Sequence, residues 1–319
     1  MRFVTLIVLT SGLFGSSGDC VAAGSRTDLP YSEYVFAGKW GFVGSDVGQF
    51  GGFDGLSSGP DGRIYGADAY HDRVQYFSPD GGFLGGWGKE GTGPGECNAP
   101  WGVDVSPDGT VYVSDYLNHR VQFFTGDGKF LGSWGSEGSG EGEFKYPAGL
   151  VIAPDGRVFV ADSKNRRVQY FTASGEYLGS WGTRDLGYRG MWFPYDVAVA
   201  SDGDVYVCGS EYMIFRCSDS GSFKGSWGFP GSADGQFQWP SALAVDRSDV
   251  LFVVDTNNRR VQYFSPDGAF LGAFGSEGRG DGEFVHPVGI TVAGDGTVYV
   301  SDEGGHNIQY FKPVTSNEP

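Results

Sequence analysis

The stretch Tyr34-Val35-Phe36-Ala37-Gly38-Lys39-Trp40-Gly41 ends in a motif of glycine, any residue, an aromatic residue and glycine. The motif occurs six times at intervals of 46 or 47 residues, and the later copies start at Gly85, Gly132, Gly179, Gly225 and Gly272. This interval is too long for a leucine-rich or ankyrin repeat and has the length of a four-stranded repeat unit.

Each repeat predicts four short strands, which are clearest in the third copy. Residues 147–152, 158–160, 168–171 and 177–182 are rich in β-branched and aromatic residues, and turn-forming residues separate them. The run Val158-Phe159-Val160 is apolar on both of its alternating faces, so both faces must be buried. A ring of sheets, each packed between two neighbours, buries both faces of every sheet.

The two ends of the chain complement each other. The chain opens with one unattached strand, Tyr34 to Gly41, and its last repeat stops after three strands at Gln309-Tyr310-Phe311. We therefore expect an all-β fold, a six-bladed β-propeller of four-stranded antiparallel blades, with the ring closed by the N-terminal strand completing the last blade.

The corner between the second and third strands carries Asp-x-x-Asn-x-Arg in units two, three and five, and a shorter form in unit one. A carboxylate five residues from a guanidinium across a corner can accept a forked hydrogen bond, which predicts a structural role for these residues. The pairs are Asp68 and Arg73, Asp115 and Arg120, Asp162 and Arg167, and Asp255 and Arg260; unit six keeps only Asp302.

This corner, with the Val-Gln-aromatic-Phe strand after it and the Pro-x-Gly-Val segment before it, resembles the NHL repeat. The resemblance covers about residues 34–312 and implies a six-bladed β-propeller. Related propellers include lyases and hydrolases that hold a metal in the central channel. NHL-like repeats also occur in intracellular ligases, kinases and RNA-binding proteins, but this sequence has no RING, kinase or basic segment beside them.

The N-terminal 23 residues have the pattern of a secretory signal peptide. Met1-Arg2 precedes an apolar run from Phe3 to Phe14 that is too short to span a bilayer, and small residues end at Ala23. We expect a signal peptide over 1–23, a short leader over 24–33, one propeller domain over 34–312 and a flexible tail over 313–319, in a secreted or periplasmic protein. Asp19 departs from the small residue that precedes a lipoprotein cysteine, so Cys20 is expected to leave with the signal.

The formal net charge of −17 excludes some classes of partner. A field of this sign repels nucleic acid and anionic lipid. We expect no nucleic-acid partner and no membrane insertion, and a monomer that binds a protein, a peptide or a glycan.

Unit four departs from the repeat. Gly209 replaces the corner aspartate, the arginine is missing, and one residue is deleted near Tyr212. Cys208 and Cys217 lie on the two arms of this hairpin, and a cross-strand pair has the Cα separation that a disulfide needs, which predicts a disulfide between them. Cys97 stands where other repeats carry phenylalanine and is expected to be a buried thiol.

Function on a repeated scaffold is expected where the copies disagree. They disagree around the proline that opens each first strand and at the corner of unit four, and both places should lie at one mouth of the channel. The expected contact residues are Trp101, Tyr146, Trp192, Tyr195, Tyr212, Trp239 and His286. An aromatic rim with a few carboxylates suits a sugar or an extended peptide, which predicts a non-catalytic binding or scaffold module.

The alternative is a metal-dependent lyase or hydrolase at the same mouth, using Asp54, Asp104, Asp196 and His286. Of the four histidines only His286 lies beside an inner-strand proline, so three histidines cannot converge on one zinc. The loops 135–143 and 275–283 are rich in glycine and acid but lack the ordered ligand spacing of a calcium loop. The sequence therefore predicts no catalytic residue, metal ligand or cofactor and favours a non-enzyme, with the metal-dependent alternative and a calcium site in these loops left open.

Overall fold

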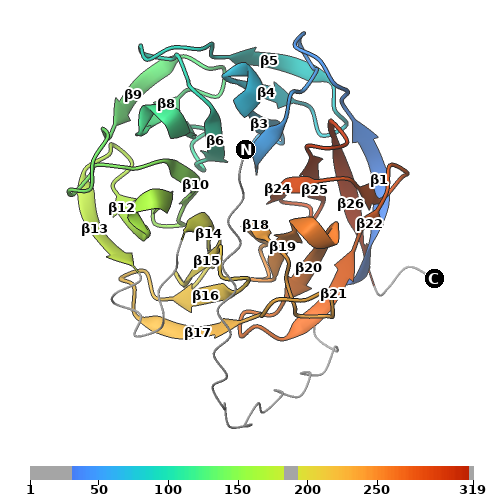
Figure 1. Ribbon diagram of the computed structural model, residues 1–319. Coiled ribbons are helices and arrows are strands. Elements are labelled where there is room, and N and C mark those ends of the chain that lie inside the picture. The colour runs from blue at the N-terminus through green and yellow to red at the C-terminus, as the bar shows by residue number, and fades with distance from the viewer. Residues whose placement is uncertain (1–30, 183–192, 316–319) are drawn as a thin grey trace, which may run out of the picture.

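The computed structural model describes residues 31–182 and 193–315, and within them six four-stranded antiparallel sheets form a ring around a central channel (Figure 1). In each of blades 1 to 5 the strands follow one another from the channel to the outer wall. Blade 1 consists of β2 (Phe53–Ser58), β3 (Ile64–Asp68), β4 (Arg73–Phe77) and β5 (Phe83–Trp87). Blade 2 consists of β6 (Pro100–Val105), β7 (Val111–Asp115), β8 (Arg120–Phe124) and β9 (Phe130–Trp134).

The next three blades repeat this plan. Blade 3 consists of β10 (Pro147–Ile152), β11 (Val158–Asp162), β12 (Arg167–Phe171) and β13 (Tyr177–Gly182). Blade 4 consists of β14 (Pro194–Val199), β15 (Val205–Gly209), β16 (Ile214–Cys217) and β17 (Phe223–Trp227). Blade 5 consists of β18 (Pro240–Val245), β19 (Leu251–Asp255), β20 (Arg260–Phe264) and β21 (Phe270–Phe274). A short parallel pair, β22 (Ser276–Glu277) and β23 (Glu283–Phe284), lies in the connection to blade 6.

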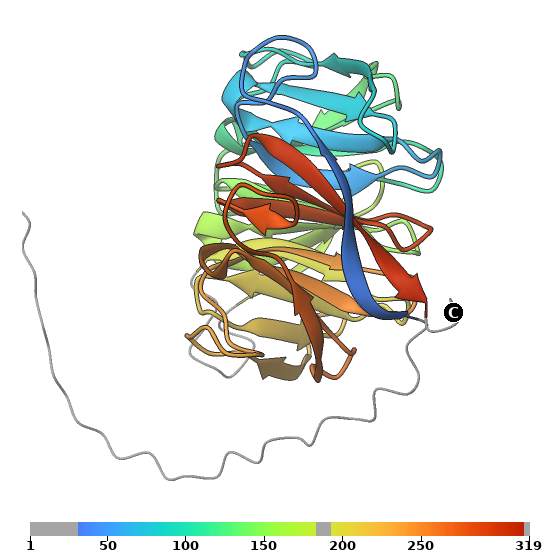
Figure 2. The same cartoon turned by 90° about the vertical axis from the view of Figure 1, so that its right-hand side faces the viewer.

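Blade 6 closes the ring with strands from both ends of the chain. Its first three strands are β24 (Pro287–Val292), β25 (Val298–Asp302) and β26 (Asn307–Thr315), and its outer strand is β1 (Tyr31–Trp40). Figure 2 shows β1 and β26 side by side on the outer wall, with Trp40 opposite Ile308 and Tyr31 opposite Thr315. The predicted closure is confirmed, and the pair reaches beyond the expected domain limits of residues 34 and 312.

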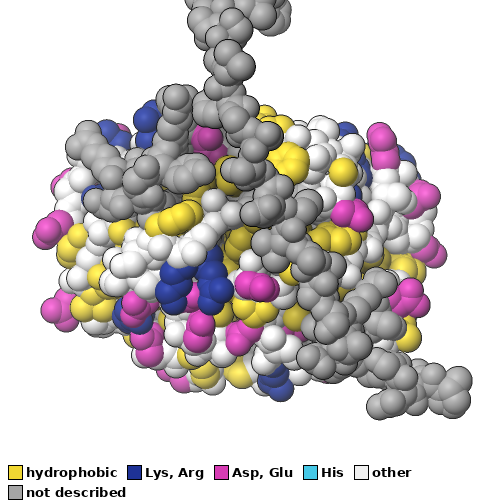
Figure 3. Space-filling view, turned by 90° about the horizontal axis from the view of Figure 1, so that it is seen from below, with side chains coloured by type: hydrophobic (Ala, Val, Ile, Leu, Met, Phe, Trp, Pro, Cys, Tyr) yellow, Lys and Arg dark blue, Asp and Glu magenta, His cyan; other side chains and the backbone are white. Residues whose placement is uncertain are grey.

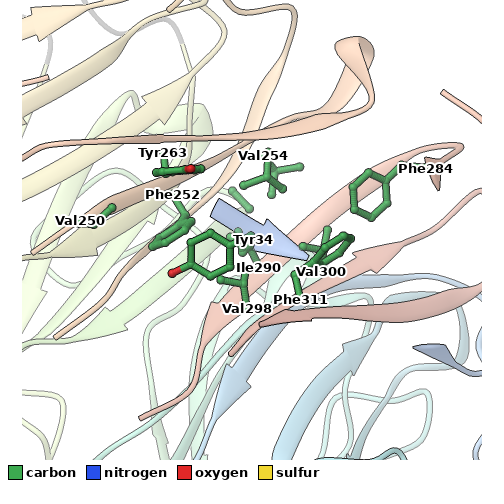
Figure 4. Close-up of a cluster of buried hydrophobic side chains, with 12 residues drawn as sticks. Tyr34, Val250, Phe252, Val254, Tyr263, Phe284, Ile290, Val298, Val300 and Phe311 are labelled. Atoms are coloured by element: carbon green, nitrogen blue, oxygen red, sulfur yellow. The ribbon is translucent and has the colours of Figure 1, made fainter. Parts of the chain in front are cut away.

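The middle strands explain why the repeat is apolar on both faces. All five residues are buried in each of β3, β7, β11, β15, β19 and β25. The hydrophobic core accordingly lies between blades rather than on one side of a sheet. Figure 4 shows one such cluster, in which Tyr34 of β1 packs against Phe252 and Tyr263 of blade 5, with ring centroids 5.3 and 5.6 Å away.

The strand register contradicts the predicted disulfide. Cys208 lies opposite Ile214 and Cys217 lies opposite Val205, so the two cysteines are not a cross-strand pair. Because neighbouring residues of a strand point to opposite faces, Cys208 packs in the cluster between blades 4 and 5, and Cys217 packs on the other face, in the cluster between blades 3 and 4. Both are free thiols, as is the buried Cys97, whose state was predicted correctly.

Figure 3 shows one side of the ring, where carboxylates are scattered among uncharged side chains and basic side chains form one group near the middle of the view and occur singly elsewhere. Among the described residues, no helix has the length and apolar character needed to cross a membrane.

Candidate binding site at the channel mouth

Two kinds of segment build one face of the ring: the loop that enters each inner strand, and the corner between the second and third strands. Pairing of Pro100 with Asp115, and of Pro240 with Asp255, places each inner-strand start beside a corner. The corners of blades 1, 2, 3 and 5 are short 3-10 turns, η2 (Ala69–His71), η3 (Tyr116–Asn118), η4 (Ser163–Asn165) and η5 (Thr256–Asn258). Side chains from both segments therefore gather at the same mouth of the channel.

The repeated aspartate and arginine hold these corners in place. In blade 2 the fully buried Asp115 accepts hydrogen bonds from Arg120 Nε at 2.8 Å and from Asn98 N at 2.7 Å. Arg120 also donates to the carbonyl oxygens of Gly93 and Glu96 in the preceding loop. Each guanidinium group thus donates to one carboxylate oxygen and to carbonyl oxygens of the preceding loop, rather than to both carboxylate oxygens as expected. The Nε to Oδ2 distances in the other blades are 3.0 Å for Arg73 and Asp68, 2.7 Å for Arg167 and Asp162, and 2.9 Å for Arg260 and Asp255.

Aromatic rings line an open cavity of about 610 Å³ at this mouth. Trp101 and Tyr116 stack in its wall with ring centroids 5.1 Å apart, and Tyr146 packs on Tyr116 at 5.0 Å. Trp239 also lines the cavity and stacks on Tyr195 at 5.4 Å, with 14° between the ring planes. The cavity therefore offers two stacked aromatic platforms, one on blades 2 and 3 and one on blades 4 and 5.

An uncommon backbone conformation carries two of these rings. Trp239 has φ 66° and Tyr146 has φ 55°, and each directly precedes the proline of an inner strand. A residue with a β-carbon loses ~1–2 kcal/mol in this left-handed region relative to its normal conformation. Trp239 is nevertheless 47% exposed, so its burial does not offset this cost. Ala99 has φ 50° at the same position before Pro100, so this conformation belongs to the repeat and directs the side chain that each copy carries there.

Three ionisable side chains share the cavity with the rings: Asp54, His286 and Glu303. His286 Nδ1 lies 2.9 Å from Glu303 Oε2, and this hydrogen bond raises the pKa of His286 and lowers that of Glu303. Within the described part of the chain Asp54 has no hydrogen-bond partner. Burial, with a contribution from the charge of Glu303, raises the pKa of Asp54 to about 8. Asp54 is therefore mostly protonated at neutral pH and can donate a hydrogen bond into the cavity.

The other two channel carboxylates have structural partners. Asp104 accepts hydrogen bonds from Ser57 Oγ of blade 1 and from Ile152 N of blade 3, and so links three inner strands. Asp196 accepts a bond from Leu243 N of blade 5 at 2.8 Å. Burial raises the pKa of Asp104, and it raises that of Asp196 to about 7.

These bonds bear on the metal-dependent alternative. Among the described residues, no three His, Cys, Asp or Glu side chains lie close enough together to hold a metal ion. Of the four residues expected for that alternative, Asp54 and His286 face the cavity at the mouth, whereas Asp104 and Asp196 hold inner strands together. In the loops considered for calcium, Glu143 and Glu283 each accept the backbone N–H of a glycine three residues earlier, at 2.8 Å.

Most of the expected contact residues lie at this mouth. Trp101, Trp239 and His286 line the cavity, and Tyr146 and Tyr195 support its rings from behind. Tyr212 is 38% exposed at the corner of blade 4, and Trp192 lies outside the described residues.

Sequence reasoning missed the residues that the corners contribute to the cavity. These are Tyr70, Tyr116, Leu117, Asn257 and Glu303. They occupy the one or two positions after each corner aspartate, where the repeats differ from one another. That disagreement is the available signal, but the regular spacing of aspartate and arginine in units one, two, three and five predicts a structural role for those corners and hides it.

An NHL-repeat family model matches residues 98–124 and 144–171, which cover the first three strands of blades 2 and 3. No curated protein sequence matches the chain. Solved structures do: a streptogramin B lyase has 14% identity and a TM-score of 0.61, over 90% of this chain and 100% of the other. A catalytically inactive virginiamycin B lyase from Staphylococcus aureus, solved with quinupristin, has 16% identity and a TM-score of 0.59, over 83% of this chain and 85% of the other. A gluconolactonase from Xanthomonas campestris has 14% identity and a TM-score of 0.61, over 84% and 88%.

The chain thus forms a six-bladed β-propeller, and two of its blades match the NHL repeat that the sequence resembles. At these identities the solved structures share the fold alone. Since these structures include lyases and a lactonase, the fold does not select an activity, and function depends on the residues of the site.

Proposed function

We propose that this protein is a secreted, non-catalytic binding module that holds a neutral glycan at the channel mouth. The observation that carries the proposal is the cavity of about 610 Å³ with Trp101, Tyr116 and Trp239 in its wall. The apolar C–H faces of a sugar ring pack well on flat aromatic rings, and an aromatic platform immobilises few rotatable bonds when it binds.

The polar groups of the cavity fit the same ligand. Protonated Asp54 can donate a hydrogen bond, Glu303 can accept one, and the Asn257 amide offers both kinds of group to sugar hydroxyls. The net charge of −17 disfavours sulfated or uronic-acid polymers, which leaves neutral sugars as the better match.

The test is an array of neutral glycans, anionic glycans and peptides probed with the mature protein and with Trp239→Gly. We expect binding to neutral glycans that falls at least ~10-fold in the variant, a loss of about 1.4 kcal/mol. The melting temperature should stay unchanged or rise, because glycine adopts φ 66° without strain. Phe229→Ala removes an aromatic side chain that is 59% exposed in an outer loop, and this control should bind like the wild type.

Two results would contradict the proposal: glycan binding that survives in Trp239→Gly, or hits confined to peptides. A marked fall in melting temperature for Trp239→Gly would instead show that this ring belongs to the core.

A lyase or hydrolase at the same mouth is the second candidate, favoured by Asp54 beside the His286 and Glu303 pair. A carboxyl group with a pKa near 8 next to an imidazole is an arrangement suited to proton transfer. Incubating the glycan hits with the protein and analysing them for cleavage tests this candidate, since product formation that is lost in Asp54→Asn would favour it.

A further inference from the structure

Four blades show how this fold holds a guanidinium group. In blades 1, 2, 3 and 5 the arginine at the corner donates from Nε to the buried aspartate and from Nη2 to two carbonyl oxygens of the preceding loop. In blade 5 these bonds run from Arg260 to Asp255 at 2.9 Å, to Ala233 O at 2.8 Å and to Gln236 O at 3.0 Å.

Blade 6 keeps the acceptors and lacks the donor. Asp302 occupies the aspartate position and is 2% exposed, and its register partner is Asn307, where the other blades place arginine. Asp302 accepts backbone N–H groups from Val285 at 3.0 Å and His286 at 2.6 Å, and within residues 31–182 and 193–315 it has no ion pair. A buried carboxylate without a cationic partner is costly. Blade 4 avoids this cost because Gly209 replaces its aspartate as well.

The loop acceptors of blade 6 are also preserved. Gly280 and Glu283 stand where Ala233 and Gln236 stand in blade 5. Glu283 O accepts Gln309 Nε2 at 2.6 Å, as the equivalent carbonyl does in the other blades, and Gly280 O receives only a long backbone bond of 3.4 Å from Glu283 N.

A cavity of about 400 Å³ lies between these groups, with Asp302, Glu283, Gly305 and Asn307 in its wall. The Oδ1 atom of Asn307 is buried and has no hydrogen-bond partner. Lys39, which also lines the cavity, directs its ammonium group to Asp281 at 2.8 Å. The cavity thus contains a carboxylate, a carbonyl and an amide oxygen that lack the strong donor present in the equivalent blades.

We propose that blade 6 binds a guanidinium group supplied from outside the domain. Its N–H groups would donate to Asp302, to the carbonyl oxygens of Gly280 and Glu283, and to Asn307 Oδ1. A guanidinium fits this set better than an ammonium ion, because its donors lie in one plane with the spread that the four internal arginines display. The group would belong either to the arginine side chain of a polypeptide or to a small guanidino compound. This site is separate from the aromatic cavity and does not depend on the proposed function.

The first test is thermal denaturation of the wild type in millimolar methylguanidinium, with methylammonium and urea as controls for charge and for shape. We expect methylguanidinium to raise the melting temperature by ~2 °C or more when it saturates the site, and both controls to have no effect. An equal shift with methylammonium would overturn the proposal, since it would show a general ionic effect.

Variants locate the site. Asn307→Arg supplies the guanidinium from the chain, so it should raise the melting temperature and abolish the response to methylguanidinium. Arg260→Asn is the matched control, because it reproduces the blade 6 arrangement in blade 5; it should lower the melting temperature and enlarge the methylguanidinium response. A response that persists unchanged in Asn307→Arg would contradict the assignment to blade 6.

Arg279 lines this cavity together with Lys39, and its guanidinium group is a candidate to fill the cavity from within the chain. The variant Arg279→Ser tests this possibility. The proposal would be wrong if Arg279→Ser lowered the melting temperature as much as Arg260→Asn does, and if the variant responded to methylguanidinium while the wild type did not. That result would show that Arg279 itself fills the cavity. Calorimetric titration with free arginine and with an arginine-containing pentapeptide separates the two sources. A ≥10-fold preference for the peptide identifies a polypeptide ligand, and equal affinity identifies a small guanidino compound.

Discussion

Asp54 offers a direct test of the electrostatics at the channel mouth. In the unfolded chain its pKa is near 3.8, and burial raises it to about 8 in the folded protein. Between these values the folded state binds the proton and the unfolded state does not, so the contribution of Asp54 to stability falls as the pH rises from about 4 to about 8.

We therefore expect Asp54→Asn to match the wild type near pH 4 and to be more stable near pH 9. The shift of the Asp54 pKa spans about four units at about 1.4 kcal/mol each, so the difference is at most ~6 kcal/mol. Urea denaturation of both proteins across this pH range measures the difference. Because burial also raises the pKa of Asp196 and Asp104, the wild-type profile alone does not isolate Asp54, and the difference between the two curves is the informative quantity. Parallel curves would show that Asp54 is ionised in the folded state.

At the residue scale, the sequence predicted the rings that come from the inner-strand loops and not those from the corners. Trp101 and Trp239 could be identified because they break the repeat beside a proline. Tyr116 and Glu303 escaped notice because they are adjacent to Asp115 and Asp302, whose regular spacing made the corner look uniform. The corners bring these two side chains to the cavity at the channel mouth, and residue spacing alone does not show this direction.

At the scale of elements, the repeated tryptophan has a specific partner in the next blade. A β-carbon added at Gly128 would lie 2.5 Å from Trp87, and one at Gly175 would lie 2.6 Å from Trp134. Both glycines sit in the hairpin between the third and fourth strands, with φ near 88°. The indole of one outer strand therefore covers a turn of the following blade, which explains why the glycine and the tryptophan repeat in phase.

This contact predicts that Gly175→Ala destabilises the protein by ~2–4 kcal/mol, the sum of the left-handed backbone cost and of a clash with Trp134. Gly156→Ala is the matched control, because Gly156 has φ 87° and no atom within 4 Å of an added β-carbon. It should cost ~1–2 kcal/mol for the backbone alone. Chemical denaturation of the two variants isolates the tryptophan contact as their difference, and equal losses would show that it contributes nothing.

The hairpin of blade 4 shows where element-level prediction fails. Placing Cys208 and Cys217 on two facing arms was correct, but a disulfide also requires them to be directly opposite on one face. Cys208 faces Ile214 in the same register as Ala161 faces Val168 in blade 3, so the deletion near Tyr212 leaves the pairing of these strands unchanged. Cys217 lies three residues beyond Ile214 and therefore points to the other face of the sheet. The presence of one cysteine on each arm does not reveal this register.

At the scale of the whole molecule, the sequence predicted both the number of blades and the way the ring closes. The chain begins with one unattached strand and its last repeat lacks one strand, and few arrangements other than a closed ring pair every strand. The identity of the ligand could not be predicted from the repeat, because the ligand contacts residues that vary between copies and that come together only when the ring is closed. The closing pair of β1 and β26 therefore positions blade 6, and with it His286, Glu303 and the cavity beside Asp302.

We expect the ring to close through the pairing of β1 with β26 wherever the two ends of the chain lie. Tyr31 lies opposite Thr315, so a short glycine-serine turn can join these residues and convert β26 and β1 into an ordinary hairpin. New ends can be opened after Asp108, in the turn between β6 and β7 of blade 2, where the adjacent Gly109 has no neighbouring atom within 4 Å of an added β-carbon. This circular permutant keeps all six sheets and moves the closing blade from 6 to 2, so we expect it to fold and to keep the mouth intact.

A variant that lacks residues 31–40 loses the outer strand of blade 6 and the packing of Tyr34 against Phe252. We expect this variant to unfold at a lower temperature and to aggregate through the exposed edge of β26. Circular dichroism melts and size-exclusion chromatography of the two proteins provide the comparison. If the truncated protein were as stable and monomeric as the permutant, the pairing of the two ends would not be what holds the ring closed.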